Sequence, residues 1–226
     1  SIYVVYPGIR PEYFSTLSQS PALTYSLSLH NKSIKLGTSQ NPVKIGFAGL
    51  LMASKGVHIL CEALLSLHEQ GIVFQACFAG NCFQSGYREA LEDMLAPTTE
   101  QSYYSFLGNL ERSQLSNFWS LQHFGVFPSI YPEAFGLSAV EIMASGVLLF
   151  SSCTGGSSEH FNHGESGISF TSNNSQSLSF CMKNYIENPH AINKIVANGK
   201  ALSLNKFTVA KSASQIIDLM ESLISY

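Results

Sequence analysis

The sequence predicts an α/β fold, a doubly wound, Rossmann-like parallel sheet of about six strands flanked by helices. From residue 43 onward, short continuous apolar runs alternate strictly with stretches of helical apolar spacing. This alternation is typical of buried parallel strands joined by right-handed helical crossovers. The chain has 226 residues, 45% of them hydrophobic, so one large domain can bury a substantial core.

The elements follow in order along the chain. Residues 1–14 read as a short apolar strand that Pro7 and Gly8 end, and residues 15–42 as a polar linker, so that 1–42 form an interdomain segment and 43–226 the organised domain. Strands are predicted over 43–49, 73–80, 103–107, 123–127, 147–151 and 167–170. Helices are predicted over 56–69, 87–95, 113–121, 137–144, 175–188, 191–203 and 208–225.

Composition excludes several classes of protein. The net charge is −3, with no long run of Lys or Arg, which disfavours nucleic acid as a partner. No apolar run approaches the roughly 20 residues of a membrane span, and the first residues do not form a signal peptide. The five cysteines are odd in number and mostly lie in apolar runs, which fits a reducing cytosol. We therefore expect a soluble cytoplasmic protein.

The aspartates restrict phosphate chemistry. Asp93 and Asp218 are the only two, and both lie in helix-like segments, so no Asp-x-Asp metal site exists. Phosphate would have to be bound by backbone amides, Lys and helix dipoles. Cys77 and Cys82 have no second pair to complete a zinc site, and the histidines after residue 159 lack helical ligand spacing. No metal site is predicted.

Two familiar enzyme classes are disfavoured. Residues 46–49 read GFAG, which is not the G-x-G-x-x-G of dinucleotide-binding domains, and no acid follows the second strand to bind a ribose. No G-x-S-x-G elbow occurs, which argues against an α/β-hydrolase.

The segment 128–146, PSIYPEAFGLSAVEIMASG, carries the strongest functional signal. It places Glu133 in a loop after a strand and Glu141 in the first turn of the following helix. In open α/β sheets, ligands bind beyond the carboxyl ends of strands, where helix N-termini favour anions. The alternative is structural: Ser138 and Glu141 also fit a capping box, and Glu133 fits an exposed loop acid.

Four segments in order resemble the donor-binding domain of the retaining glycosyltransferases of family 4, which have the GT-B fold. They are GLLMASKG at 49–56, FLGN at 106–109, the segment 128–146 and TGGSSEHFNHGESG at 154–167. The resemblance covers residue 43 to the C-terminus. It implies one half of a GT-B architecture, whose N-terminal acceptor domain is absent from this chain.

The resemblance implies roles for three charged residues. Lys55 would lie against the diphosphate of a nucleotide sugar and stabilise the charge that grows on the leaving group. Glu133 would lie against the transferred sugar, and Glu141 would accept hydrogen bonds from the ribose. Lys55 and Glu133 are thus the implied catalytic residues. A solvated Lys at a helix start is the alternative reading of Lys55.

It also implies backbone and polar contacts with the donor, from loops where glycine lets the chain approach closely. These residues are Gly49, Gly80, Asn81, Gly108, Asn109, Ala134, Phe135, Gly136, Leu137, Gly155, Gly156 and Glu159. The Gly-Asn pairs are equally explained as plain turns. Phe118 and Trp119 are expected in the core.

Two positions depart from the family pattern. The strand before Pro128 usually begins with Asp, where this chain has His123, and that difference reads as structural. The family usually has an Arg where this chain has Leu50, so one cation at the diphosphate is missing.

The implied reaction is a metal-independent transfer, without any cofactor, of a hexose, best assigned as glucose. The donor is a nucleotide diphosphate sugar, best assigned as UDP-glucose. The acceptor is a saccharide or a lipid-linked molecule in polysaccharide or glycoconjugate biosynthesis, which is compatible with peripheral membrane contact. Two alternatives stay open: a nucleotide-sugar binding module without turnover, and a UDP-sugar epimerase of the same fold.

Overall fold

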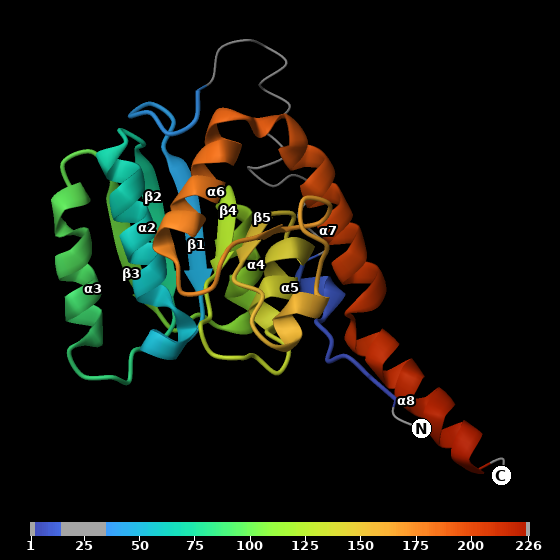
Figure 1. Ribbon diagram of the computed structural model, residues 1–226. Helices are drawn as coiled ribbons and strands as arrows, with labels where there is room; N and C mark the ends of the chain where they lie inside the picture. The colour runs from blue at the N-terminus through green and yellow to red at the C-terminus, as the bar shows by residue number, and fades with distance from the viewer. Residues whose placement is uncertain (1–2, 15–34, 225–226) are drawn as a thin grey trace.

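A computed structural model describes residues 3–14 and 35–224. Six parallel strands form one sheet in the order β3-β2-β1-β4-β5-β6. Figure 1 shows β3, β2, β1, β4 and β5 side by side in this order. The strands are β1 (Val43–Ala48), β2 (Phe74–Ala79), β3 (Tyr103–Gly108), β4 (Phe124–Phe127), β5 (Leu148–Ser151) and β6 (Ile168–Ser169). The predicted doubly wound sheet of about six strands is confirmed. The order reverses between β1 and β4, which is where such folds bind ligands.

Helices cover both faces of the sheet. The α-helices are α2 (Val57–Glu69), α3 (Tyr87–Leu95), α4 (Arg112–Ser120), α5 (Leu137–Ala144), α6 (Ser175–Glu187), α7 (Ile192–Lys206) and α8 (Val209–Ile224). Short 3-10 turns are η1 (Pro11–Tyr13), η2 (Ala53–Lys55), η3 (Ala96–Thr98), η4 (Gly156–Glu159) and η5 (Pro189–Ala191). All the predicted helices are present, with ends within three residues of the predicted ones.

Two apolar cores lie on opposite faces of the sheet. In the first, α2, α3 and α6 pack on side chains such as Phe74 and Phe150. In the second, α4 and α5 pack on the other face, together with Phe207 after α7. Phe118 and Trp119 are buried in this second core, as expected. Because strands buried on both faces alternate their side chains between two cores, their sequences read as continuous apolar runs.

The N-terminal prediction was wrong within the described residues. Residues 3–8 form no strand, and residues 1–2 and 15–34 lie outside the described part. Instead, the amide of Ile9 donates to Phe207 O at 2.8 Å, and the amide of Val209 donates to Ile9 O at 2.9 Å. A Cβ on Gly8 would stand 2.1 Å from the carbonyl carbon of Thr208. This segment therefore pairs with the α7–α8 junction and not with the sheet.

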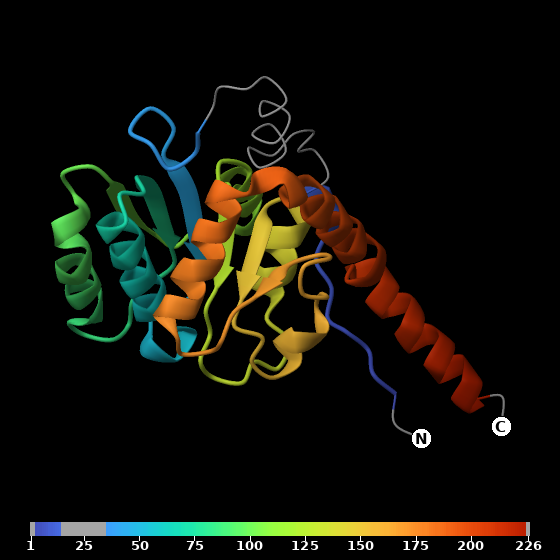
Figure 2. The same ribbon diagram turned by 45° about the horizontal axis from the view of Figure 1, so that its top comes forward.

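Helix α8 extends away from the sheet in both views (Figures 1 and 2). None of its described residues is buried. Its exposed apolar side chains include Ile216, Ile217, Met220, Leu223 and Ile224. None of the helices in the described ranges is both long and apolar enough to cross a membrane.

Candidate functional site

A cavity of about 320 Å³ opens at the carboxyl ends of β1, β2 and β3, beside the first turns of α4 and α5. It lies next to the point where the strand order reverses. Its lining comprises Ala48, Gly49, Leu50, Ala79, Gly80, Asn81, Asn109, Leu110, Arg112, Leu115, Leu137, Ser138 and Glu141. A small polar molecule with an apolar part fits such a lining.

Backbone hydrogen bonds hold the cavity's loops together beyond the strand ends. Gly49 N donates to Ala79 O at 2.9 Å, and Gly80 N donates to Gly108 O at 2.7 Å. Gly80 has φ +142, and a Cβ there would stand 1.8 Å from the Gly49 carbonyl oxygen. Only glycine allows this approach, because any side chain would force the two loops apart. The loops therefore form one rigid wall of the cavity.

Glu141 brings a carboxylate to the cavity from α5. The residue is only 7% exposed. Burial raises the pKa of Glu141 to about 7, and the nearby charge of Arg112 opposes that rise. Near neutral pH this carboxyl group therefore changes between a hydrogen-bond donor and a pure acceptor.

The start of α5 differs from the prediction in two ways. The helix begins at Leu137, so Glu141 is its fifth residue and lies past the first turn. Gly136 is the N-cap, with φ 86, and no side chain caps the helix. The capping-box alternative for Ser138 is therefore wrong. The glycine's left-handed conformation starts the helix two residues earlier and turns Glu141 into the protein interior and the cavity.

Lys55 and Glu133 form an ion pair outside the cavity lining. Lys55 Nζ lies 2.6 Å from Glu133 Oε1, with the two side chains 32% and 13% exposed. The hydroxyl of Ser129 donates to the same oxygen at 2.6 Å. The amide of Ile130 donates to Ser54 O at 3.0 Å, which brings the loop after β4 against the turn that carries Lys55. One oxygen of Glu133 thus binds both Ser129 and Lys55, and Lys55 lies 78 positions away from Glu133 in the sequence.

The loops after β4 and β5 are joined by their backbones. Gly156 N donates to Glu133 O at 2.7 Å, and Glu133 N donates to Thr154 O at 3.3 Å. A Cβ on Gly156 would stand 2.2 Å from the Ala134 carbonyl oxygen. The Gly155-Gly156 pair therefore has a structural task here, which is to support the loop that carries Glu133.

Glu159 contacts the N-terminal segment. Its carboxylate accepts a hydrogen bond of 2.6 Å from the hydroxyl of Tyr6. The Tyr6 ring also packs on Phe135, at 5.7 Å between centroids. Sequence reasoning missed Tyr6, because nothing local signals a contact with a residue 153 positions later.

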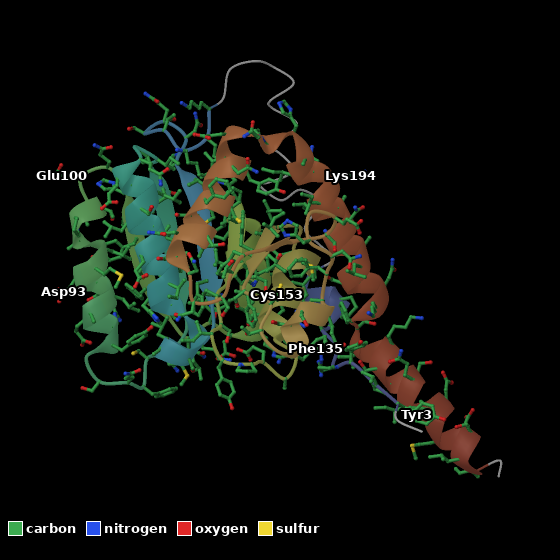
Figure 3. All side chains as sticks on the ribbon, in the orientation of Figure 1. Tyr3, Asp93, Glu100, Phe135, Cys153 and Lys194 are labelled. Atoms are coloured by element: carbon green, nitrogen blue, oxygen red, sulfur yellow. The ribbon has the colours of Figure 1, made fainter. Side chains whose placement is uncertain are left out.

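His160 packs against the loop after β4, which carries Glu133 and Phe135. Its ring is fully buried and packs edge-on against Phe135, with centroids 4.4 Å apart. Neither ring nitrogen has a hydrogen-bond partner within the described residues. Burial lowers the pKa of His160 to about 4, so the ring is neutral at physiological pH. Figure 3 places Phe135 close to α5.

The structure sorts the sequence-predicted residues into two groups. Gly49, Gly80, Asn81, Asn109, Leu137 and Glu141 line the cavity. Lys55, Glu133, Ala134, Phe135, Gly136, Gly155, Gly156 and Glu159 belong to the loops after β1, β4 and β5, and Gly108 ends β3. Together they occupy one edge of the sheet, as parallel strands require.

Sequence reasoning missed Arg112, a cation in the cavity lining. It stands at the first residue of α4, four positions after the end of β3. Its position in the sequence could have indicated the site. A residue that begins a helix after a parallel strand lies at the carboxyl edge of the sheet. Within the described residues, no group of three or more His, Cys, Asp or Glu side chains is placed to hold a metal ion.

Comparison with known proteins identifies the family. Residues 30–202 match the family described as glycosyl transferases group 1. The chain belongs to this family. An uncharacterized glycosyltransferase of Methanocaldococcus jannaschii is 26% identical over 222 residues, covering 96% of this chain and 53% of the relative. A glycogen synthase of Mycobacterium tuberculosis is 26% identical over 178 residues, covering 77% and 42%. The chain thus spans about half the length of these group 1 relatives.

Solved structures show the same fold. Anabaena HepE, determined in complex with UDP and glucose, superposes with a TM-score of 0.78 at 24% identity, over 97% of this chain and 56% of that one. The C-terminal domain of a group 1 glycosyltransferase from Francisella tularensis has a TM-score of 0.70 at 22% identity. That domain is covered over its whole length, and it covers 89% of this chain.

Proposed function

We propose that residues 43–226 are the donor-binding domain of a retaining glycosyltransferase of family 4. It would transfer a hexose, with glucose the first candidate, from UDP-glucose to a saccharide or lipid-linked acceptor. The observation that carries the proposal is the cavity at the strand reversal, which Glu141 lines, with the Lys55–Glu133 pair in the loops after β1 and β4 at the same edge of the sheet. The UDP and glucose bound to HepE support the choice of donor.

The residues divide the binding of the donor between them. A nucleoside fits the cavity, where the Glu141 carboxylate accepts hydrogen bonds from the ribose hydroxyls. The diphosphate then extends toward the uncapped amides at the start of α5, which favour anions. The sugar comes to lie beside Lys55 and Glu133.

The ion pair supplies the electrostatics of the transfer. Lys55 carries the positive charge that stabilises the leaving diphosphate, and Glu133 holds the sugar hydroxyls and the positive character of the reacting carbon. In the structure the lysine, with Ser129, fixes the carboxylate. Such a preorganised pair needs no large reorganisation when the donor arrives. We assign no nucleophile to the protein, and we propose that the reaction proceeds without a metal.

The partner of this domain is proposed to be its own N-terminal domain, which supplies the acceptor site. The matched relatives are about twice as long as this chain. Helix α8 presents an exposed apolar stripe that includes Ile217, Met220 and Leu223. A stripe of this kind on a helix without buried residues is typical of an interaction surface.

Calorimetric titration of the 226-residue chain tests donor binding. UDP, ADP, GDP and their glucose conjugates are compared without added metal and with Mg²⁺. The proposal expects UDP and UDP-glucose to bind best, without need of metal, and Glu141→Ala to weaken them. Glu100→Ala is the matched control, because Glu100 is exposed and lies beside α3, far from α5 (Figure 3). If all six ligands fail to bind, or if Glu141→Ala and Glu100→Ala lose affinity for UDP equally, the assignment of the cavity is wrong.

A second candidate function is a nucleotide-sugar binding module without turnover. Leu50, at the position of the family's usual Arg, lines the cavity and is 42% exposed. A donor-hydrolysis and transfer assay on the full-length protein separates the two functions. Turnover above background for a UDP-sugar supports the transferase, whereas binding without turnover supports the module.

A further inference from the structure

We propose that Arg112 is a positioning residue of this cavity, whose guanidinium favours the charged, hydrogen-bond-accepting form of the Glu141 carboxylate for the nucleotide's ribose. This inference rests on the proposed function of the cavity. It assigns a task to a residue that no motif of the chain singles out. The two side chains come from different helices, α4 and α5, and line the same cavity of about 320 Å³.

Arg112 is the one cation in the lining of this cavity, and Glu141 is the one acid. Arg112 forms no ion pair within the described residues, so its charge is not neutralised by a neighbouring carboxylate. Its charge acts on Glu141 across the cavity and opposes the effect of burial. Lys55 cannot replace it here, because that ammonium is held by Glu133.

The other residues that line the cavity are uncharged, and the lysines of the helix packed against α5 do not line it. The loops after β1 and β2 and the start of α5 contribute only uncharged residues to the lining. Strands β4 and β5, which pack against α5, contain no titratable side chain. Helix α7 packs against α5 and carries Lys194, Lys200 and Lys206, none of which lines the cavity. Among the residues that line the cavity, Arg112 is therefore the one positive charge that opposes the larger effect of burial on Glu141.

The consequence for binding follows from hydrogen-bond chemistry. An ionised carboxylate accepts hydrogen bonds from two vicinal hydroxyls, whereas a protonated one must itself donate one proton. Without the positive charge, a carboxyl group this deeply buried stays protonated to higher pH. Arg112 thereby extends nucleotide binding down to neutral pH.

The test measures the titration of Glu141 directly, without any ligand. The 226-residue chain is labelled with ¹³C at the glutamate side-chain carboxyls, and the Glu141 signal is assigned by its loss in Glu141→Gln. Arg112→Gln is expected to raise the titration midpoint of Glu141 by about half a unit or more, the effect of removing one charge within about 10 Å. Arg112→Lys keeps the charge and should leave the midpoint close to that of the wild type. Arg112 is exposed, so these variants should fold.

Arg88→Gln is the matched control, because Arg88 lies on α3 and pairs with Glu92 at 3.0 Å. It should not move the Glu141 midpoint. The inference is overturned if Arg112→Gln leaves the midpoint unchanged, or if Arg112→Lys moves it as far as Arg112→Gln does.

A second readout, the affinity for UDP, tests the functional part. Arg112→Gln should lower the affinity roughly two- to threefold near pH 7 and leave it unchanged near pH 9, where both chains carry an ionised Glu141. A loss that persists at pH 9 would show a direct contact and overturn the positioning role. If the midpoint moves as expected and UDP binds to no variant at any pH, the coupling of the two residues stands and the proposed function of the cavity fails.

Discussion

Replacing Glu141 by Gln should make the protein more stable above neutral pH, even though the residue belongs to the candidate site. Gln keeps the shape of the side chain but cannot ionise. The wild-type carboxyl group must give up its proton in a buried place as the pH rises, and this costs free energy of folding. The variant escapes that cost while losing an acceptor for the ribose, so stability and function should change in opposite directions.

The magnitude follows from the pKa of Glu141, which burial raises from 4.5 to about 7. Below pH 4.5 both the folded and the unfolded chain hold the proton, so the contribution of Glu141 to the free energy of unfolding is at its most favourable. Between these two values the unfolded chain releases the proton and the folded chain keeps it, so the free energy of unfolding falls as the pH rises. The total fall through this one group is about 3 kcal/mol, complete above pH 7.

The assay is urea unfolding of the wild type and of Glu141→Gln at several pH values between 4 and 9. The difference between the two free energies of unfolding is plotted, because the contributions of other titrating groups cancel in it. The difference should grow with pH in favour of the variant and level off above pH 7. Parallel stability curves for the two proteins across this range would refute the assignment of a buried, titrating Glu141.

Three further predictions concern the neighbouring loops. Lys55→Met in the full-length protein should lower the rate of sugar transfer by about 100-fold or more through loss of charge at the leaving diphosphate, whereas Lys183→Met on α6 should leave it unchanged. Gly80→Ala should lower the free energy of unfolding in urea by about 2 kcal/mol or more, since the new Cβ would stand 1.8 Å from a carbonyl oxygen. The control Gly71→Ala has open space around it and should lower the free energy of unfolding by only about 1 kcal/mol. As the pH falls from 6.5 to about 4, the free energy of unfolding of the wild type should fall by about 3 kcal/mol through His160, because the unfolded chain takes up the proton before the buried ring does. His160→Leu should not show this fall. Equal acid sensitivity of the two chains would contradict this.

The predicted strands and helices agree with the structure because their signal is local. A run such as residues 43–48 is apolar throughout, since its side chains alternate between two buried faces. The sequence signal of the turns that end these strands is also local. Parallel strands bring their carboxyl ends to one edge of the sheet. This is why Gly49, Gly80 and Asn109 meet around one cavity although they are far apart in the sequence.

Local reasoning failed where a segment's partner is distant. The apolar N-terminal residues were expected to form a strand, but Ile9 pairs with the backbone beside Thr208. The hydrogen bond from Tyr6 to Glu159 joins residues 153 positions apart and had no local signal either. The helix after Glu133 starts earlier than the capping pattern of Ser138 suggested, because Gly136 adopts a left-handed conformation.

The sequence by itself determined the fold class, the edge of the sheet that holds the site, and the residue types available there. Only the tertiary structure decided which side chains come together: Lys55 pairs with Glu133, and Arg112 lines the same cavity as Glu141. The physical reason is that strand and helix periodicity depends on neighbouring residues. The direction of a side chain in a loop depends instead on backbone contacts such as Gly80 N with Gly108 O, which form only when the whole sheet is assembled.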